Sequence, residues 1–208
     1  MRFADLDAVT VNGYGTLLRL VDPVPALTAS LAERGVAGDS AGDAFLAEVA
    51  YYKPNACSGR DSESLAALRL ECTQVFLEAA GADLDPATFV DAFMAAIVME
   101  PEPGAREAVR SLRARGLDLA VVSNWDIGLV EHLERLGLAQ HFAFVATTAA
   151  AGAPKPDPAV FRLALDRLGV DPARVLHIGD EDGDEAGAGA AGMRFARAPL
   201  AAALEGWS

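Results

Sequence analysis

The first regular pattern in the chain is a short apolar run that stops at a polar residue. Val9 and Val11 are β-branched, Asn12 follows them, and a glycine-rich turn leads on to Thr16 and Leu17. β-Branched residues favour strands, and glycines allow the tight backbone of a loop. In parallel α/β sheets, functional groups gather at the carboxyl ends of strands. The stretch therefore predicts a buried strand that ends in a reactive loop; a turn that only caps a core strand is the alternative.

A helical period runs through the next part of the chain. Apolar positions recur with the spacing of a helix face over residues 23–34, 44–52, 64–80 and 86–99. Gly35 and Gly81 are expected to end two of these helices, and Asp85 with Pro86 is expected to begin the last one. Because no strand pattern interrupts residues 39–99, the sequence predicts a small helical insert.

Strand and helix patterns alternate after the proline-rich segment 101–104. Strands are expected at 117–123, 142–146, 175–178 and 193–196, and helices at 105–115, 127–136, 159–168 and 186–192. Repeated βα units imply a parallel sheet with helices on both faces. The sequence therefore predicts an α/β domain formed by residues 1–18 and 101–208, a helical domain at 19–100, and a loosely attached tail after Pro199.

The net charge of the chain argues against nucleic acids and anionic membranes as binding partners. The 208 residues carry a formal net charge of -13, which opposes binding to nucleic acid or to an anionic membrane, because sequence-independent binding of that kind is driven by basic residues. The chain shows no apolar run long enough to cross a bilayer and no signal-peptide pattern, so a soluble cytoplasmic protein is expected. Cys57 and Cys72 lack neighbours at zinc-ligand spacing and are expected to be reduced thiols.

Three further stretches carry candidate chemistry. One strand ends in Ser123-Asn124, a pair that also serves simple turn chemistry. Lys155 stands between two prolines and is one of two lysines in the chain; a solvated loop lysine is the alternative. A later strand delivers a cluster of carboxylates into one loop: Asp180, Glu181, Asp182 and Asp184. Crowded carboxylates repel one another unless a cation binds, which predicts a metal site; an acidic turn that caps a helix through Asp182 or Asp184 is the alternative.

In this order the stretches resemble the sequence motifs of the haloacid dehalogenase superfamily of hydrolases. The segment 12–17 is similar to motif I, Ser123 to motif II, Lys155 to motif III, and the segment 179–184 to motif IV. The helical insert lies between motifs I and II, where the family's C1-type helical cap belongs. The resemblance covers almost the full length and implies a Rossmann-like α/β fold with an inserted cap.

The resemblance also implies a reaction and roles for individual residues. It implies a Mg²⁺-dependent phosphatase that acts on a small phosphorylated metabolite through an aspartyl-phosphate. The catalytic positions would be Asn12, Tyr14 and Lys155. The phosphate-binding positions would be Thr16, Ser123, Asn124 and Lys155, and the Mg²⁺ positions would be Asn12, Tyr14, Asp180 and Asp184. Neither the pattern nor the resemblance predicts an oligomeric state.

Two positions depart from the family pattern. Asn12 stands where the family has its nucleophilic aspartate, and a carboxamide is a poor nucleophile without the charge of a carboxylate. It is an engineered trap, a natural loss that leaves a phosphate-binding or regulatory protein, or an asparagine that deamidates. We favour an engineered or otherwise isolated change, because the other catalytic positions remain suited to their roles: Thr16, Ser123, Lys155, Asp180 and Asp184. Tyr14 stands where the family's phosphatases have a second aspartate and its dehalogenases have tyrosine. Tyr14 therefore favours a 2-haloacid dehalogenase, whereas the acidic motif IV favours a phosphatase.

A few other residues have less specific interpretations. Candidate lid contacts in the helical insert are Tyr51, Tyr52, Lys53, Arg60 and Arg69, with simple exposure as the alternative for most of them. Trp125 is expected to line the pocket or to pack in the core. His177 is expected to be a core or supporting residue and not a catalytic one.

Overall fold

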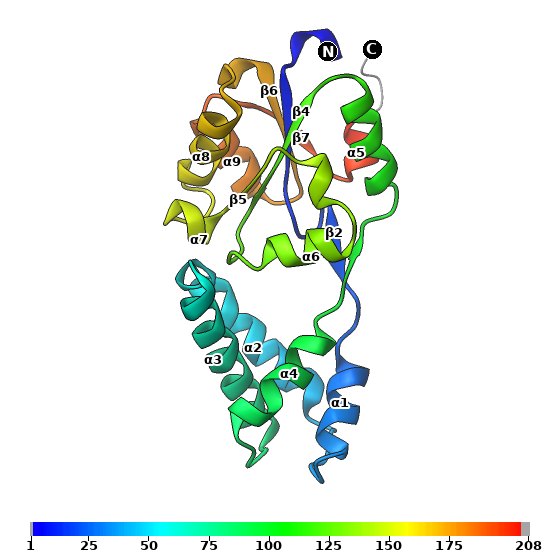
Figure 1. Ribbon diagram of the computed structural model, residues 1–208, viewed down its shortest axis with the longest axis vertical. Helices are drawn as coiled ribbons and strands as arrows, with labels where there is room; N and C mark the ends of the chain where they lie inside the picture. Colours follow the sequence, from blue (N-terminus) through cyan, green and yellow to red (C-terminus); the bar gives the residue numbers. More distant parts are fainter. Residues whose placement is uncertain (1, 205–208) are drawn as a thin grey trace. The chain divides into compact units, whose positions relative to one another are not determined.

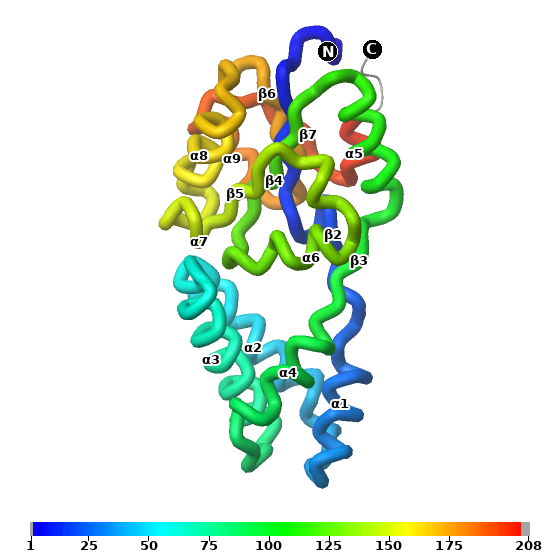
Figure 2. Tube along the Cα trace, viewed as in Figure 1, coloured from blue at the N-terminus to red at the C-terminus, as the bar shows by residue number. Residues whose placement is uncertain are grey.

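A computed structural model describes residues 2–204, and the chain divides into two compact units. One unit contains the chain up to Arg19 and again from Glu100 onward, and the other contains Leu20–Met99. The chain passes between them at two short strands that pair with each other, β2 (Leu18–Leu20) and β3 (Met99–Pro101). Figure 2 shows these strands side by side. The second unit is thus inserted into the first as one continuous segment.

The first unit is built on a five-stranded parallel sheet. Its strands are β1 (Ala8–Val11), β4 (Asp118–Ser123), β5 (Phe144–Thr147), β6 (Val175–Gly179) and β7 (Arg194–Arg197), in the order β5-β4-β1-β6-β7. β1 is the central strand, and all four of its residues are buried, because a strand covered on both faces has no side exposed to water. The predicted Rossmann-like α/β class is confirmed.

Helices cover both faces of this sheet. α8 and α9 lie against one face, while α5 and α10 lie on the other (Figure 1). Beneath α8, Ala8 and Val122 of the strands pack in one cluster with Val160 and Phe161 of the helix. The helices and 3₁₀ turns of this unit are η1 (Phe3–Asp5), α5 (Ala105–Ala114), α6 (Leu129–Arg135), η3 (Ala139–His141), α7 (Thr148–Ala151), α8 (Ala159–Leu168), η4 (Pro172–Arg174), α9 (Asp182–Ala190) and α10 (Leu200–Ala203).

Gly187 allows α9 to pack closely against α8. A Cβ atom on Gly187 would collide with the ring of Phe161 in α8 and would lie 3.1 Å from the carbonyl oxygen of Pro156. Only a residue without a side chain allows α9 to approach α8 and its entry loop so closely. The alanine- and glycine-rich segment therefore packs on its neighbours as a helix, as predicted.

The second unit consists of helices. They are α1 (Val24–Ala32), α2 (Ala41–Asn55), η2 (Ala56–Ser58), α3 (Ser62–Ala80) and α4 (Pro86–Ala96). Several phenylalanines pack in their core, and the Phe76 centroid lies 6.0 Å from that of Phe89 and 5.2 Å from that of Phe93. Asp61 caps α3 through the Ser64 N–H. Among residues 2–204, no helix combines the length and the apolar character needed to cross a bilayer.

The structure differs from the sequence prediction in short segments. β2, β3 and α7 have only three or four residues each, which is too short to show a period in the sequence. The prediction of a loose tail after Pro199 is wrong for residues 200–203, because they form α10 and Leu200 is buried. The rest of that tail, 205–208, lies outside the described residues.

Candidate functional site

The candidate site lies at the carboxyl edge of the parallel sheet. Asn12 follows β1 directly, Ser123 is the last residue of β4, and Asp180 follows β6. Because β1 lies between β4 and β6 and all three run parallel, these residues meet at one edge. Lys155 reaches the same place from the loop between α7 and α8. The sheet therefore brings together residues from all four predicted motifs.

Two glycines allow the loop after β1 to approach the other site residues. Gly15 has a φ of 80°, a conformation that favours glycine, and a Cβ atom there would collide with the Asp180 carboxylate. A Cβ atom on Gly13 would lie 2.7 Å from Oγ of Ser123. The glycines of motif I are thus required by close packing within the site.

The side chain of Asn12 is buried and uses both ends of its amide. Its Oδ1 accepts a hydrogen bond from Nζ of Lys155 at 2.8 Å and lies 3.4 Å from Oγ of Ser123. Its Nδ2 donates to Oδ1 of Asp180 and to the backbone carbonyl of Tyr14, both at 2.8 Å. The amide therefore connects the lysine on one side to the carboxylate on the other.

Lys155 is a buried positive charge beside Asn12. Its Nζ also donates to Oδ1 of Asp184 at 2.6 Å and to the Val122 carbonyl at 3.3 Å. Burial lowers the pKa of Lys155, and the charge of Asp184 opposes this shift. Asn124 accepts the Lys155 backbone N–H at 2.8 Å and donates to its carbonyl at 3.4 Å. Asn124, which was expected to bind phosphate, therefore positions the lysine in this structure.

A buried chain of hydrogen bonds supports Lys155 from within the sheet. Oδ1 of Asp184 pairs with Nε2 of His177 at 3.1 Å, and Nδ1 of His177 pairs with Oγ1 of Thr10 at 2.9 Å. Because a carboxylate only accepts, neutral His177 carries its hydrogen on Nε2, and Thr10 donates to Nδ1. Thr10 and His177 face each other in the β1–β6 register. His177 is thus a supporting residue, as expected.

The charges in this buried chain are fixed by their neighbours. Burial lowers the pKa of His177, which keeps the imidazole neutral near pH 7. Burial alone would raise the pKa of Asp184, but the hydrogen bond from His177 and the charge of Lys155 outweigh it and lower the pKa. Oδ2 of Asp184 accepts the backbone N–H of Glu181 at 3.1 Å. Both oxygens of Asp184 are therefore used inside the protein, which does not match the metal-binding role expected of it.

Thr16 and Tyr14 also make contacts within the site, and their expected roles toward phosphate and metal stay predictions. The Thr16 hydroxyl, expected to contact phosphate, donates to Oδ1 of Asp180 at 2.7 Å. The Tyr14 side chain is 53% exposed, so its backbone carbonyl is the group that contacts Asn12. Thr16 therefore helps to orient Asp180, while the ring of Tyr14 points to solvent.

Basic residues of the chain itself neutralise much of the acidic loop. Arg197 donates to Asp182 at 2.9 Å and to Glu185 at 3.0 Å, while Lys155 pairs with Asp184. Among residues 2–204, no three His, Cys, Asp or Glu side chains are grouped in a way that could hold a metal ion. An arginine and a lysine thus supply part of the positive charge at this loop, and a bound cation stays a prediction.

The donor set does not fit Mg²⁺ while residue 12 is asparagine. Mg²⁺ binds oxygen ligands in near-octahedral geometry. Oδ1 of Asp180 and the Tyr14 carbonyl are suitable oxygens, but both face Nδ2 of Asn12. The expected metal ligand Asn12 thus presents a nitrogen to this position and its oxygen to Lys155.

Other predicted residues lie away from this network. The Trp125 ring is half-buried, with its centroid 5.7 Å from that of His132 in α6. The candidate lid residues belong to the helical unit, where the Tyr51 hydroxyl donates to Glu71 at 2.9 Å. Their contact with a substrate stays a prediction.

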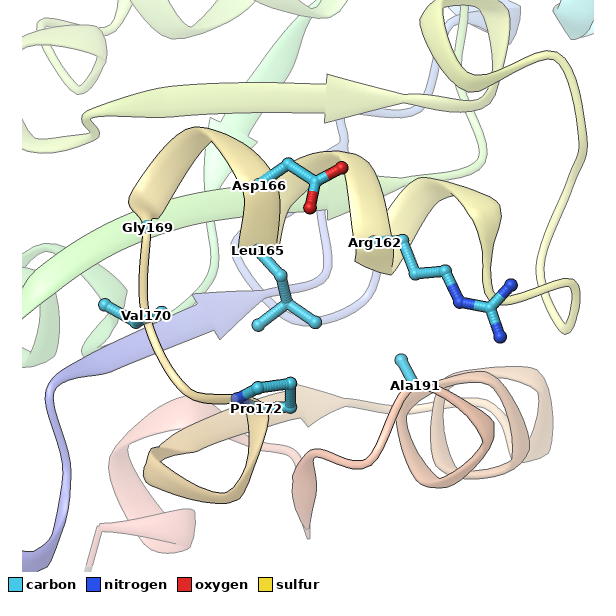
Figure 3. Close-up of a pocket in the computed structure, with 7 residues that line it drawn as sticks. All are labelled: Arg162, Leu165, Asp166, Gly169, Val170, Pro172 and Ala191. Atoms are coloured by element: carbon cyan, nitrogen blue, oxygen red, sulfur yellow. The ribbon is translucent and has the colours of Figure 1, made fainter.

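A cavity of about 420 Å³ lies in another part of the α/β unit. Its lining comes from α8, the segment that leads towards β6 and the end of α9, as Figure 3 shows, and consists of Arg162, Leu165, Asp166, Gly169, Val170, Pro172 and Ala191. It contains none of the predicted site residues. The cavity is therefore separate from the site at the sheet edge.

Sequence reasoning missed Thr10 and Arg197. A polar residue inside an apolar strand was the available signal for Thr10, but its partner His177 is defined only by the strand register. Arg197 follows the acidic loop by more than ten positions and meets it because β7 runs beside β6. Neither contact can be derived from local spacing.

A family model described as "haloacid dehalogenase-like hydrolase" matches residues 14–192. The chain is 53% identical over 77 residues to "Haloacid dehalogenase-like hydrolase domain-containing protein 3" of Mus musculus, a match that covers 37% of this chain and 31% of that protein. It is 40% identical over 94 residues to phosphoserine phosphatase of Thermus thermophilus, covering 44% and 38% respectively. The chain thus matches well under half the length of these curated relatives.

A solved structure matches a larger share of the chain. L-2-haloacid dehalogenase from Xanthobacter autotrophicus, with chloropropionic acid covalently bound, is 26% identical with a TM-score of 0.68. The match covers 92% of this chain and 77% of that one. The fold is therefore shared across both units of the chain.

Proposed function

Since this chain belongs to the haloacid dehalogenase-like hydrolases, we propose that its site binds the phosphate group of a small phosphorylated metabolite. In this proposal the amide at position 12 prevents hydrolysis of the bound phosphate ester. The observation that carries this proposal is Nζ of Lys155, buried and 2.8 Å from Oδ1 of Asn12. A buried ammonium at the sheet edge is suited to an anion. Lys155 supplies positive charge at the site, although the chain as a whole has a net charge of -13.

The phosphatase form of the site requires a carboxylate at position 12. In that form an oxygen of the side chain attacks phosphorus, the alcohol leaves, and water hydrolyses the resulting acyl-phosphate. Lys155 would neutralise negative charge on the carboxylate and on the phosphate. The amide of Asn12 has no comparable nucleophile, because its nitrogen lone pair is delocalised and its oxygen is uncharged. The phosphoserine phosphatase relative supports phosphate esters as the substrate class.

Binding of inorganic phosphate to the chain as it stands tests the first half of the proposal. We expect calorimetry to detect binding that is lost in Lys155→Met, because this variant removes the buried charge. Arg110→Met is the control, since Arg110 is an exposed basic residue on α5 with no expected role in the site. Equal phosphate affinity in both variants would contradict the proposed site.

Turnover by Asn12→Asp tests the second half. We expect this variant to hydrolyse at least one member of a phosphate-ester panel, with a gain of several powers of ten over the parent, each tenfold worth about 1.4 kcal/mol. Acid-quench mass spectrometry should detect an acyl-phosphate on residue 12. If Asn12→Asp binds phosphate but neither turns over nor forms this intermediate, the chain is a binding or regulatory protein.

Dehalogenation is the second candidate, favoured by Tyr14 and by the dehalogenase fold match. It predicts that Asn12→Asp releases halide from 2-haloacids in the presence of a chelator. Ion chromatography of halide, run beside the phosphate-ester panel, decides between the two reactions. Our proposal expects free phosphate and no halide.

A further inference from the structure

The orientation of the Asn12 amide is determined by its three nearest partners. Lys155 Nζ only donates hydrogen bonds, whereas the Asp180 carboxylate and the Tyr14 carbonyl only accept them. The observed arrangement satisfies all three contacts at 2.8 Å. Turning the amide by half a rotation would place Nδ2 against the ammonium and Oδ1 against two oxygens. The network therefore permits one orientation, with the nitrogen facing Asp180.

Nδ2 of Asn12 lies between two oxygens that are suitable ligands for a cation. The two hydrogens of Nδ2 are directed to Oδ1 of Asp180 and to the Tyr14 carbonyl. Thr16 adds a third donor, at 2.7 Å from the same Asp180 oxygen. These oxygens are thus satisfied by hydrogen bonds from the protein alone.

We infer that the Asn12 carboxamide substitutes for a divalent cation, so that this chain maintains its phosphate site without Mg²⁺. The inference rests on the proposed function only in naming the ligand of the site. Mg²⁺ entering here would have to displace an amide nitrogen that donates to two oxygens and is itself no ligand for a hard cation. The site is therefore metal-independent as long as residue 12 is asparagine.

One substitution should reverse this property. In Asn12→Asp an oxygen replaces Nδ2 and faces Oδ1 of Asp180 and the Tyr14 carbonyl, where two carboxylates repel each other. Three oxygens at one point form a typical site for a hard cation. Asn12→Asp should therefore become less stable in a chelator and recover in Mg²⁺.

The test measures Mg²⁺ binding without reference to turnover. Calorimetry and thermal unfolding are run in EDTA and in excess Mg²⁺ on the parent, on Asn12→Asp and on Asn12→Asp combined with Asp180→Asn. We expect no Mg²⁺ response in the parent, a rise of about 5 °C in the Tm of Asn12→Asp, and loss of most of that rise in the double variant. Mg²⁺ affinity in Asn12→Asp should exceed that of the parent by at least about a hundredfold.

The mass of residue 12 must be known in each sample, because Asn12 precedes Gly13, the residue that least hinders deamidation. Peptide mass spectrometry of the parent establishes that the amide is intact. Mg²⁺ binding by a parent with intact Asn12, abolished by Asp180→Asn, would overturn the inference. If Asn12→Asp does not fold, the parent with and without Asp180→Asn still decides, since we expect neither to respond to Mg²⁺. Phosphate binding is measured separately, so failure of the proposed function would be recognised independently.

Discussion

Individual side chains in this site are held by partners of opposite hydrogen-bonding character. Lys155 donates to Oδ1 of Asp184, and Nε2 of His177 contacts the same oxygen. A buried ion pair contributes little net stability, because desolvation offsets the attraction, but removal of one member leaves an uncompensated charge. The network therefore acts mainly by fixing where the ammonium of Lys155 lies.

Thr10→Val tests the inner end of this network. Valine keeps the shape of threonine but leaves Nδ1 of His177 without its donor in a fully buried position. We expect the free energy of unfolding to fall by about 1 to 3 kcal/mol, measured by urea denaturation. Thr88→Val is the control, because that hydroxyl is exposed and donates to the Asp85 carbonyl; its cost should stay below about 0.5 kcal/mol. Equal costs would contradict a structural role for the buried pair.

At this scale the sequence predicted which residues gather and not how they are oriented. Motif spacing brought Asn12, Ser123, Lys155 and Asp180 to one sheet edge, since that depends on strand ends and parallel pairing. The direction of the Asn12 amide depends on contacts between residues more than a hundred positions apart. Local pattern contains no information about such contacts.

Among the helices, α2 carries a buried carboxyl group that no motif predicts. Glu48 is 7% exposed, and burial raises its pKa from 4.5 to about 7, while a hydrogen bond from Cys72 of α3 opposes the shift. The helical period identified the segment as a helix because apolar residues dominate one face. Glu48 lies at helical spacing from Ala44 and Phe45 on the buried face of α2. Its residue type is rare in such a position, so the period alone did not single it out as a buried carboxyl group.

Glu48→Gln tests this burial through its dependence on pH. Between pH 4.5 and about 7 the folded chain keeps the proton that the unfolded chain has released, so stability falls as pH rises through this range. Glutamine has no proton to release, so the variant does not lose this stability. We expect the free energy of unfolding of Glu48→Gln, relative to that of the parent, to be about 1 to 3 kcal/mol higher at pH 8 than at pH 4. Urea denaturation at both pH values measures the difference. Glu78→Gln, exposed on α3, should change stability by less than about 0.5 kcal/mol at either pH.

At the scale of the whole molecule, the described residues contain two hydrophobic clusters that share no residue. One cluster lies among α1 to α4 of the helical unit, and the other lies between α8 and the sheet. The change from helical periodicity to βα alternation predicted both parts, because period is a local property of the sequence. The two-stranded sheet of β2 and β3 was not predicted, since these short strands are defined only by their pairing with each other on either side of the insert. Because one cluster belongs to each unit, each unit is expected to open locally by itself.

Matched phenylalanine substitutions test this independence. Phe76 belongs to the core of the helical unit and Phe161 to that of the α/β unit, and both are fully buried. Replacement of either by alanine is expected to cost about 3 to 5 kcal/mol. Hydrogen exchange followed by mass spectrometry should place the lost protection of Phe76→Ala within residues 20–99, and that of Phe161→Ala in the remainder of the chain, because neither cavity removes contacts from the other core. Protection lost equally across both units in either variant would show that the chain opens as one cooperative body.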